Sequence, residues 1–248
     1  MFVQTKDSFA YAFRDGIEAL TSLVPGSYHT TAPNGTLLAL TYSVIPALNP
    51  IVVPQADPDS DEVATLAGLA ARKAGPVPWS VRLRGEPGER LREIAARHGR
   101  TTATSQPFMT ATVDGARAVD ASVRQIKGDE FRTFATVVAG VFGAPPELVS
   151  AVYTAEVLDS PQVAAFLAET PRGEPVAAGV AVITGEYAGL ANIGTLPAFR
   201  GQGHARKVTE ALLSSGAKHF YLHADEQTTG FFERFGFATA ENWTMLTP

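Results

Sequence analysis

The chain has 248 residues, a formal net charge of -5 and a hydrophobic content of 45%. This length is enough to bury a sizeable core, as one large domain or two small ones, and the negative charge argues against a general nucleic-acid-binding protein. The sequence contains no cysteine, which excludes disulfides, thiolate metal sites and a cysteine nucleophile.

The N-terminal stretch MFVQTKDSFAYAFRDG interrupts its apolar residues with charges, and no apolar run in the chain approaches the roughly 18 residues that a membrane span needs. We therefore expect a cytoplasmic protein with neither membrane nor nucleic-acid partners. An anionic ligand would have to meet a local cluster of basic residues, because the chain as a whole is acidic.

Hydrophobic periodicity predicts the elements of residues 1–113 in chain order. They are a helix over 9–23, strands over 36–44 and 50–54, a helix that begins at Asp59 or Ser60 and ends at Gly75, a strand over 79–83, a helix closed by Gly99, and a strand over 101–113. Residues 114–121 are small and polar without periodicity, so we predict a linker there between domains at 1–113 and 122–248.

The second domain is predicted to begin with an amphipathic helix that starts near Phe131 and stops at Pro145 and Pro146. After it we expect a hairpin of 163–169 with 176–184, a strand over 190–196, a helix to about 215, a strand over 219–224, a short helix and a last strand around 242–246. Each domain thus ends in strand, helix, strand, helix closed by glycine, and strand. This shared order predicts a degenerate internal duplication.

The stretch Arg200-Gly201-Gln202-Gly203-His204-Ala205 opens the helix that follows the strand at 190–196. A Walker loop is excluded because no Lys-Ser or Lys-Thr follows the glycines, and a dinucleotide fingerprint is excluded because residue 206 is arginine. Small residues at 201, 203 and 205 would let backbone N–H groups at a helix N-terminus approach a pyrophosphate. The neighbouring Arg200, Arg206 and Lys207 supply local positive charge.

Two stretches carry a resemblance to a known family. TLPAFRGQGHARKV resembles the acyl-CoA signature of the GNAT superfamily of N-acetyltransferases, and YLHADEQTTGFFERFGF resembles the family's later strand, helix and terminal E-R-x-G-F hallmark. The resemblance covers about residues 122–247. It implies an α/β (α+β) fold of two GNAT-like mixed-sheet domains, of which the C-terminal one is intact and catalytic. The N-terminal one is degenerate, because VVPQADPDSDE places acids and a proline where the signature has arginine and glycines.

The resemblance also implies the chemistry, which is direct transfer of an acetyl group from acetyl-CoA, as cosubstrate, to a small-molecule or peptide amine in a ternary complex without a metal. The cofactor-binding residues that it implies are Ile193, Gly194 and Thr195 along the pantetheine arm, and Arg200, Gly201, Gln202, Gly203, His204, Ala205 and Arg206 at the pyrophosphate. Asp225 and Phe232 stand where the family commonly has asparagine and tyrosine.

Because Phe232 cannot protonate the leaving thiolate, the thiolate departs unassisted or uses Tyr221 or Tyr187. Candidate bases are Glu186 and His223, although such residues are more often a turn residue and part of a solvated or packed polar strand face, respectively. An alternative function is a catalytically attenuated CoA-binding sensor or interaction protein, and a purely structural tandem domain is a third. A monomer and a homodimer are both compatible with the sequence.

Overall fold

The computed structural model describes residues 5–113, 115 and 118–248. These residues form two compact units, one of Met1–Thr110 with His223–Pro248 and one of Ala111–Leu222. The predicted linker at 114–121 lies partly outside the described residues, since 114, 116 and 117 are not among them. The C-terminal stretch His223–Pro248 therefore belongs to the first unit. The division into domains at 1–113 and 122–248 remains a prediction from the sequence.

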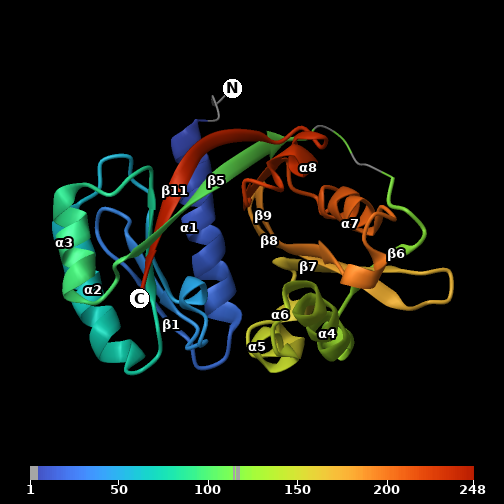
Figure 1. Cartoon of the computed structure of the whole chain (residues 1–248), viewed down its shortest axis with the longest axis horizontal. Coiled ribbons are helices and arrows are strands. Elements are labelled where there is room, and N and C mark those ends of the chain that lie inside the picture. Colours follow the sequence, from blue (N-terminus) through green and yellow to red (C-terminus); the bar gives the residue numbers. More distant parts are fainter. Residues whose placement is uncertain (1–4, 114, 116–117) are drawn as a thin grey trace. The chain divides into compact units, whose positions relative to one another are not determined.

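The first unit is built on a mixed sheet (Figure 1). Its strands, in spatial order, are β1 (Tyr28–Thr31), β2 (Leu37–Leu40), β3 (Pro50–Val53), β4 (Ser80–Arg84), β11 (Ala238–Thr247) and β5 (Thr102–Thr112). β3 and β4 run parallel, whereas the other neighbouring pairs run antiparallel.

The last strand of the chain lies inside this sheet, between β4 and β5 (Figure 1). Trp243 is paired with Arg84 of β4 on one side and with Gln106 of β5 on the other. The sequence predicted this strand but not its partners, because an alternating pattern shows that a strand has a buried face and does not show which strand it pairs with.

Helices cover both faces of the first unit's sheet (Figure 1). The helices are α1 (Lys6–Leu23), α2 (Ser60–Ala74), α3 (Glu89–Arg97), the short α8 (Thr229–Glu233) and the 3-10 turn η1 (Pro46–Leu48). Val81 and Leu83 pack in one core cluster with residues of α2 and α3. Because side chains alternate along a strand, Arg82 and Arg84 project to the opposite face. Phe13 of α1 packs on that face, with its ring centroid 5.2 Å from that of Trp243.

The second unit also contains both parallel and antiparallel strands. Its strands, in spatial order, are β6 (Val123–Ile126), β7 (Val163–Glu169), β8 (Pro175–Thr184), β9 (Tyr187–Thr195) and β10 (His219–His223), whose last residue belongs to the first unit. All neighbours are antiparallel except β9 and β10, which run parallel. The predicted hairpin of 163–169 with 176–184 is confirmed as β7 and β8.

Two helices lie on opposite faces of this sheet, α4 (Phe131–Phe142) and α7 (His204–Leu212), as Figure 1 shows. The remaining helical segments are α5 (Pro146–Ser150), α6 (Ala155–Asp159), η2 (Gly128–Glu130) and η3 (Pro197–Phe199). Close packing of α7 depends on Gly179 of β8, where a Cβ atom would lie 2.7 Å from Val208 Cγ1 and 2.8 Å from Leu212 Cδ1.

Most predicted elements are present, with three local differences. The strand predicted over 36–44 ends at Leu40, and Tyr42 beyond it has a φ of 60°, which interrupts an extended chain. Gly143, in the left-handed conformation, ends α4, and Pro146 begins α5 instead of ending a helix. The short strands β1 and β6 were not predicted, because four-residue segments carry too little periodicity.

Strand order supports the idea of a duplication. The order β3, α2, β4, α3, β5 matches β9, α7, β10, α8, β11, and in both series the first two strands run parallel.

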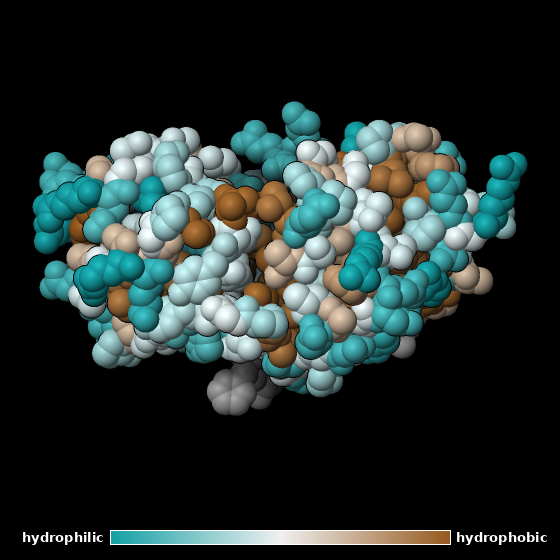
Figure 2. Space-filling view, turned by 90° about the horizontal axis from the view of Figure 1, so that it is seen from below, coloured by the Kyte–Doolittle hydropathy of each residue, from teal (hydrophilic) through white to brown (hydrophobic). Residues whose placement is uncertain are grey.

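Among the described residues, no helix is both long enough and apolar enough to cross a bilayer. On the face shown in Figure 2, polar side chains cover much of the surface, and apolar residues lie between them in separate groups.

Candidate active site

The parallel strands of the second unit separate along their length. β9 and β10 pair from Tyr187 with His219 to Gly189 with Tyr221, and within the described chain the pairing stops there although β9 continues to Thr195. The end of β9 stays paired with β8. The other edge of this part of β9 is not paired with β10. Its backbone N–H and C=O groups could therefore pair with an extended ligand, as with an added strand.

A β-bulge shapes this part of β9. The register with β8 shifts between Ala178 and Val180, opposite Asn192, which has a left-handed φ of 55°. Burial raises the pKa of Tyr153 to about 12, and a hydrogen bond with Asn192 opposes this rise. Tyr153 therefore keeps its phenolic proton at neutral pH and supports the bulge, which is a common device for redirecting a strand beside a binding site.

Gly194, predicted beside the pantetheine arm, has a structural reason of its own. A Cβ atom at this position would lie 2.2 Å from Val141 Cγ1 of α4. Glycine is therefore required for α4 to pack on β9. Ile193 and Gly194 are partly exposed, and Thr195 is buried.

The glycine loop leads directly into α7. Gly201 and Gly203 have φ values of 78° and 83°, and a Cβ atom at either position would meet nothing within 4 Å. Glycine is thus required here by backbone conformation and not by crowding. Arg200, Gly201, Gln202 and Gly203 are exposed.

The N-terminus of α7 has no side-chain cap. Gly203 is its N-cap residue, and the first helical bond runs from Lys207 N to Gly203 O at 3.1 Å. The N–H groups of the first helical residues, His204, Ala205 and Arg206, therefore have no acceptor within the helix. Together with the helix dipole, these N–H groups favour an anion above the open glycine loop.

The cations near the loop are less free than the sequence indicates. Arg200 donates from Nε to Thr195 O at 3.3 Å and from Nη2 to Val141 O at 3.5 Å, which fastens the loop to β9 and α4. Arg206 is exposed and forms an ion pair with Glu210 at 3.0 Å.

Lys207 is directed away from the loop toward the segment before β6. Its Nζ lies 3.3 Å from Asp120 Oδ1 and donates to Ser122 Oγ at 3.0 Å. Hydrogen bonds from Ser122, with help from Lys207, lower the pKa of Asp120 to about 2. We infer that the loop depends on backbone N–H groups, Arg200 and Arg206 for its affinity for anions.

His204, the first residue of α7, has a buried ring. Its Nδ1 atom has no hydrogen-bond partner among the described residues. A buried ring supports the prediction that His204 offers its backbone N–H to a ligand. The open loop and the uncapped helix together fit an anionic group such as the pyrophosphate of CoA.

Glu186 and Tyr187 lie at the opposite end of β9 from the loop. At about 3.3 Å per residue, the nine-residue strand separates them from Thr195 by roughly 25 Å or more. Glu186 pairs with Lys218 Nζ at 2.5 Å, and this contact lowers the pKa of the Glu186 carboxyl. A lowered pKa makes this carboxylate a weaker base.

Tyr221 lies where β9 and β10 separate. Its side chain is buried, and a Cβ atom at Gly189 would lie 2.6 Å from Tyr221 Cε2 and 2.8 Å from its hydroxyl oxygen. The structure therefore brings Tyr221 to the last paired position of the two strands, while Glu186, Tyr187 and His219 lie at their beginning.

Three predicted site residues belong to the first unit. Asp225 is exposed and its backbone carbonyl accepts from Thr228 N at 2.8 Å. Phe232 of α8 is buried, with its ring 5.0 Å from that of Phe231. His223 contacts a group of aromatic rings, and burial followed by the charge of Arg82 lowers its pKa well below 6.5. This electrostatic effect of Arg82 on His223 was not predicted, and the only sequence signal was the alternation of arginines with Val81 and Leu83.

The helix that corresponds to α7 in the first unit begins differently. Asp59 is the N-cap of α2, and its Oδ1 accepts from the backbone N–H groups of Asp61 at 2.9 Å and Glu62 at 3.2 Å. The carboxylate of Glu62 accepts from Asn34 N at 2.5 Å. This helix start is already satisfied by carboxylates of the chain itself.

Among the described residues, there is no group of three or more histidine, cysteine, aspartate or glutamate residues that could hold a metal ion.

Comparisons with known proteins agree with this geometry. Residues 161–239 match the family model described as an acetyltransferase (GNAT) domain. The fold resembles that of a GCN5-related N-acetyltransferase from Kribbella flavida, with a TM-score of 0.64 and 17% identity over 96% of this chain and 95% of that one.

A functionally unknown conserved protein from Staphylococcus epidermidis has a similar fold, with a TM-score of 0.60 and 12% identity over 92% of this chain and 96% of that one. No curated protein matches the sequence. These likenesses establish the fold along nearly the whole chain.

Proposed function

We propose that the chain is an N-acetyltransferase that moves an acetyl group from acetyl-CoA to an amine, because residues 161–239 match the model of a GNAT acetyltransferase domain. The observation that carries the proposal is the uncapped N-terminus of α7 behind the open loop of Gly201 and Gly203. In this proposal the loop from Arg200 to Arg206 holds the pyrophosphate. The pantetheine arm lies along the end of β9, at Ile193, Gly194 and Thr195, where the strand has separated from β10.

In the proposed reaction the nitrogen of a neutral amine attacks the thioester carbonyl directly, because the chain has no cysteine to carry the acyl group. A backbone N–H group at the end of β9 donates to the oxyanion that develops. The C–S bond then breaks, CoA leaves as thiolate, and the nitrogen loses a proton to give the amide.

We assign the acid for the thiolate to Tyr221, because this tyrosine lies where β9 and β10 separate and Phe232 has no hydroxyl group. Glu186 is not part of the proposed mechanism, since it is paired with Lys218 at the far end of β9. His223 remains a predicted base. Its lowered pKa keeps the imidazole neutral at neutral pH, but it also makes His223 a weaker base than an ordinary histidine.

Only the C-terminal half binds CoA in this proposal. The N-terminus of α2 carries a carboxylate cap and the further acids Asp61 and Glu62, so a pyrophosphate would be repelled there. The proposed tandem arrangement, with a degenerate half at residues 1–113 and an active half at 122–248, is supported by the repeated order of elements and by the similarity along nearly the whole chain.

The test is release of CoA thiol from acetyl-CoA with a panel of small-molecule and peptide amines, together with calorimetric titration of CoA. The expected result is binding of one CoA per chain and thiol release that depends on the amine and slows in Tyr221→Phe. The alternative, a CoA-binding sensor, is favoured by the replacement of the usual tyrosine with Phe232. Binding without amine-dependent release would support the sensor, and absence of binding would contradict both.

A further inference from the structure

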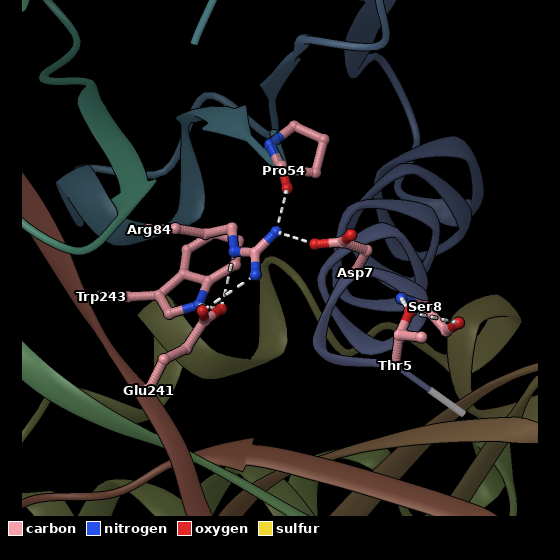
Figure 3. A network of polar contacts seen from close by, with 7 residues as sticks. All are labelled: Thr5, Asp7, Ser8, Pro54, Arg84, Glu241 and Trp243. Carbon is pink, nitrogen blue, oxygen red and sulfur yellow. Dashed lines mark hydrogen bonds and ion pairs between the residues drawn. The ribbon is translucent and has the colours of Figure 1, made fainter. Parts of the chain in front are cut away.

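Two arginines on β4, Arg82 and Arg84, project to the same face of the first unit's sheet, but their guanidinium groups have different hydrogen-bond and ion-pair partners. Arg84 is buried and forms two bonds with Glu241, from Nε at 2.8 Å and from Nη2 at 3.0 Å. It also contacts Asp7 at 2.5 Å and donates to Pro54 O at 3.2 Å. Figure 3 shows Arg84 between these acceptors. Arg84 therefore has the ion-pair and hydrogen-bond partners that a desolvated cation in a folded protein normally has.

Arg82, two residues earlier, forms no ion pair with any described residue. Its Nη2 lies 3.4 Å from Gln106 Oε1 and 3.3 Å from Met245 Sδ, and its guanidinium carbon lies 5.6 Å from the centroid of the Phe13 ring. Burial lowers the pKa of Arg82 to about 10, so the group still carries its charge at neutral pH. A 3.4 Å contact with an amide oxygen and a contact with a thioether sulfur, which is a weak acceptor, compensate poorly for the hydration that this cation has lost.

His223, whose pKa is influenced by the charge of Arg82, is a second buried group with incomplete hydrogen bonding. Its Nε2 atom is buried and has no hydrogen-bond partner among the described residues. Its ring centroid lies 4.7 Å from that of Phe13, 4.9 Å from that of Phe108 and 5.5 Å from that of Trp243. The Phe13 ring thus contacts both the guanidinium of Arg82 and the imidazole of His223.

As whole residues, Arg82 and His223 are each partly exposed, whereas the Nε2 atom of His223 is buried. We propose that Arg82 and His223 form a binding site for the carboxylate of a small aromatic acid, with the guanidinium and the imidazole as donors and the neighbouring rings as the apolar wall.

A carboxylate fits better than a phosphate group for two reasons. A guanidinium presents two parallel N–H groups to the two oxygens of a carboxylate, and this pairing neutralises one charge with one charge. A phosphate monoester carries up to two charges and more oxygens, and the described residues around Arg82 provide no second cation in contact with it. The site lies within the first unit and does not require bound CoA, but it shares His223 with the base predicted for the acetyl transfer.

The experiment titrates the full chain, without CoA, with three probes followed by NMR of ¹⁵N-labelled histidine side chains and by calorimetry. The probes are benzoate, benzamide as its uncharged analogue, and inorganic phosphate. Benzoate is expected to bind and to shift the His223 ring signals, with an affinity about tenfold or more above those of benzamide and phosphate, because the charge-assisted contact is the main difference.

Arg82→Met is expected to lower the benzoate affinity about tenfold or more while leaving the melting temperature unchanged or raised, since it removes an unpaired desolvated charge. Arg100→Met is the matched control. Arg100 also lies over an aromatic ring, with its guanidinium carbon 4.4 Å from the Trp79 centroid, and its buried Nε has no hydrogen-bond partner among the described residues. Benzoate binding should be unchanged in this control.

If Arg82→Met fails to fold, Arg82→Lys replaces it, and the loss of the planar fork should still weaken benzoate binding. The proposal is overturned if benzoate does not shift the His223 signals of the wild-type chain, if benzamide or phosphate binds as tightly, or if the Arg100 variant loses affinity as the Arg82 variant does.

Discussion

The helices α2 and α7 occupy corresponding places in the two series of elements but begin in opposite ways. In α2 the side chain of Asp59 accepts from two backbone N–H groups of the first turn, and Asp61 and Glu62 add negative charge. In α7 the N-cap is Gly203, which has no side chain, and the loop before it is open. The backbone N–H groups at the start of α2 therefore bind a carboxylate of the chain itself, whereas those at the start of α7 remain available for a ligand.

This difference has a physical lesson about helix starts. Unpaired N–H groups at a helix N-terminus attract any anion, and a carboxylate from the chain satisfies them without loss of binding entropy. A helix that is to bind a free anion must therefore lack a capping side chain, and with glycine as the N-cap it gives up roughly a few tenths of a kcal/mol of stability as a consequence. Asp59 and Gly203 represent the two outcomes.

The largest expected effect comes from giving α7 the carboxylate that α2 has. Gly203→Asp should lower the affinity for CoA about a hundredfold or more, because like charges brought together cost several kcal/mol. Gly203 has a φ of 83°, so the variant also loses about 1 kcal/mol of stability, and a capping geometry with extended backbone is not available to the new aspartate. Calorimetric titration of the folded variant measures the affinity.

Gly216→Asp is the matched control for this variant. Gly216 also has a positive φ, of 96°, is exposed, and has open space where a Cβ would lie, but it follows the C-terminal end of α7. The control should lose similar stability and retain its affinity for CoA. A second CoA site that survives in Gly203→Asp would contradict the view that α2 cannot bind the pyrophosphate.

A smaller effect is expected from the exposed arginine of α7. Arg206→Gln should weaken CoA binding about three- to tenfold at low salt, and the effect should shrink as salt rises, because one screened charge contributes about 1 kcal/mol. Arg97→Gln on α3 is the control, since Arg97 also pairs with a glutamate one turn away, at 3.9 Å, on an exposed surface. Equal loss of affinity in both variants would show that the effect is not local to the loop.

Removing the cap of α2 should change stability and not binding. Asp59→Ala is expected to lower the free energy of unfolding by about 1 kcal/mol, because two backbone N–H groups of the first turn lose their acceptor. Its affinity for CoA should equal that of the wild type. Urea denaturation and CoA titration of the same preparation measure both quantities, and a change in affinity would indicate that α2 contributes to the ligand site.

The smallest expected effect is the pH dependence of the α2 cap. Hydrogen bonds from Glu62 N and from the Asn34 side chain lower the pKa of Asp59 from 3.8. The unfolded chain then binds the proton more tightly than the folded one, so the stabilisation is complete above pH 3.8 and is lost as pH falls through the lowered pKa. Asp59→Ser, which caps without titrating, should lose less stability than the wild type between about pH 5 and pH 3. Equal acid sensitivity of the two proteins would contradict this prediction.

Local signals in the sequence were sufficient for the two helix starts. Asp59 followed by an apolar period predicts the cap of α2, and the glycines at 201 and 203 ahead of an amphipathic pattern predict an uncapped start for α7. Both depend on backbone geometry within a few residues, which composition and spacing encode directly. The hairpin of β7 and β8 is predicted for the same reason.

Residues far apart in the chain decided the rest. The sequence indicates that Lys207 is a cation of the loop, but in the structure Lys207 pairs with Asp120. The sequence indicates that Gly194 contacts a ligand, but in the structure Gly194 makes room for Val141 of α4. These pairings join segments more than fifty residues apart, and the spacing of either segment contains no record of the other.

The sequence by itself therefore determined the class of fold, most helices and strands, and the loop that resembles an acyl-CoA signature. The tertiary structure alone decided that β11 lies between β4 and β5, that β9 and β10 separate after Gly189, and that Arg82 lies beside His223 without a carboxylate. The physical reason is that capping and periodicity act between near neighbours, whereas strand order and the pairing of buried charges depend on which distant surfaces exclude water together.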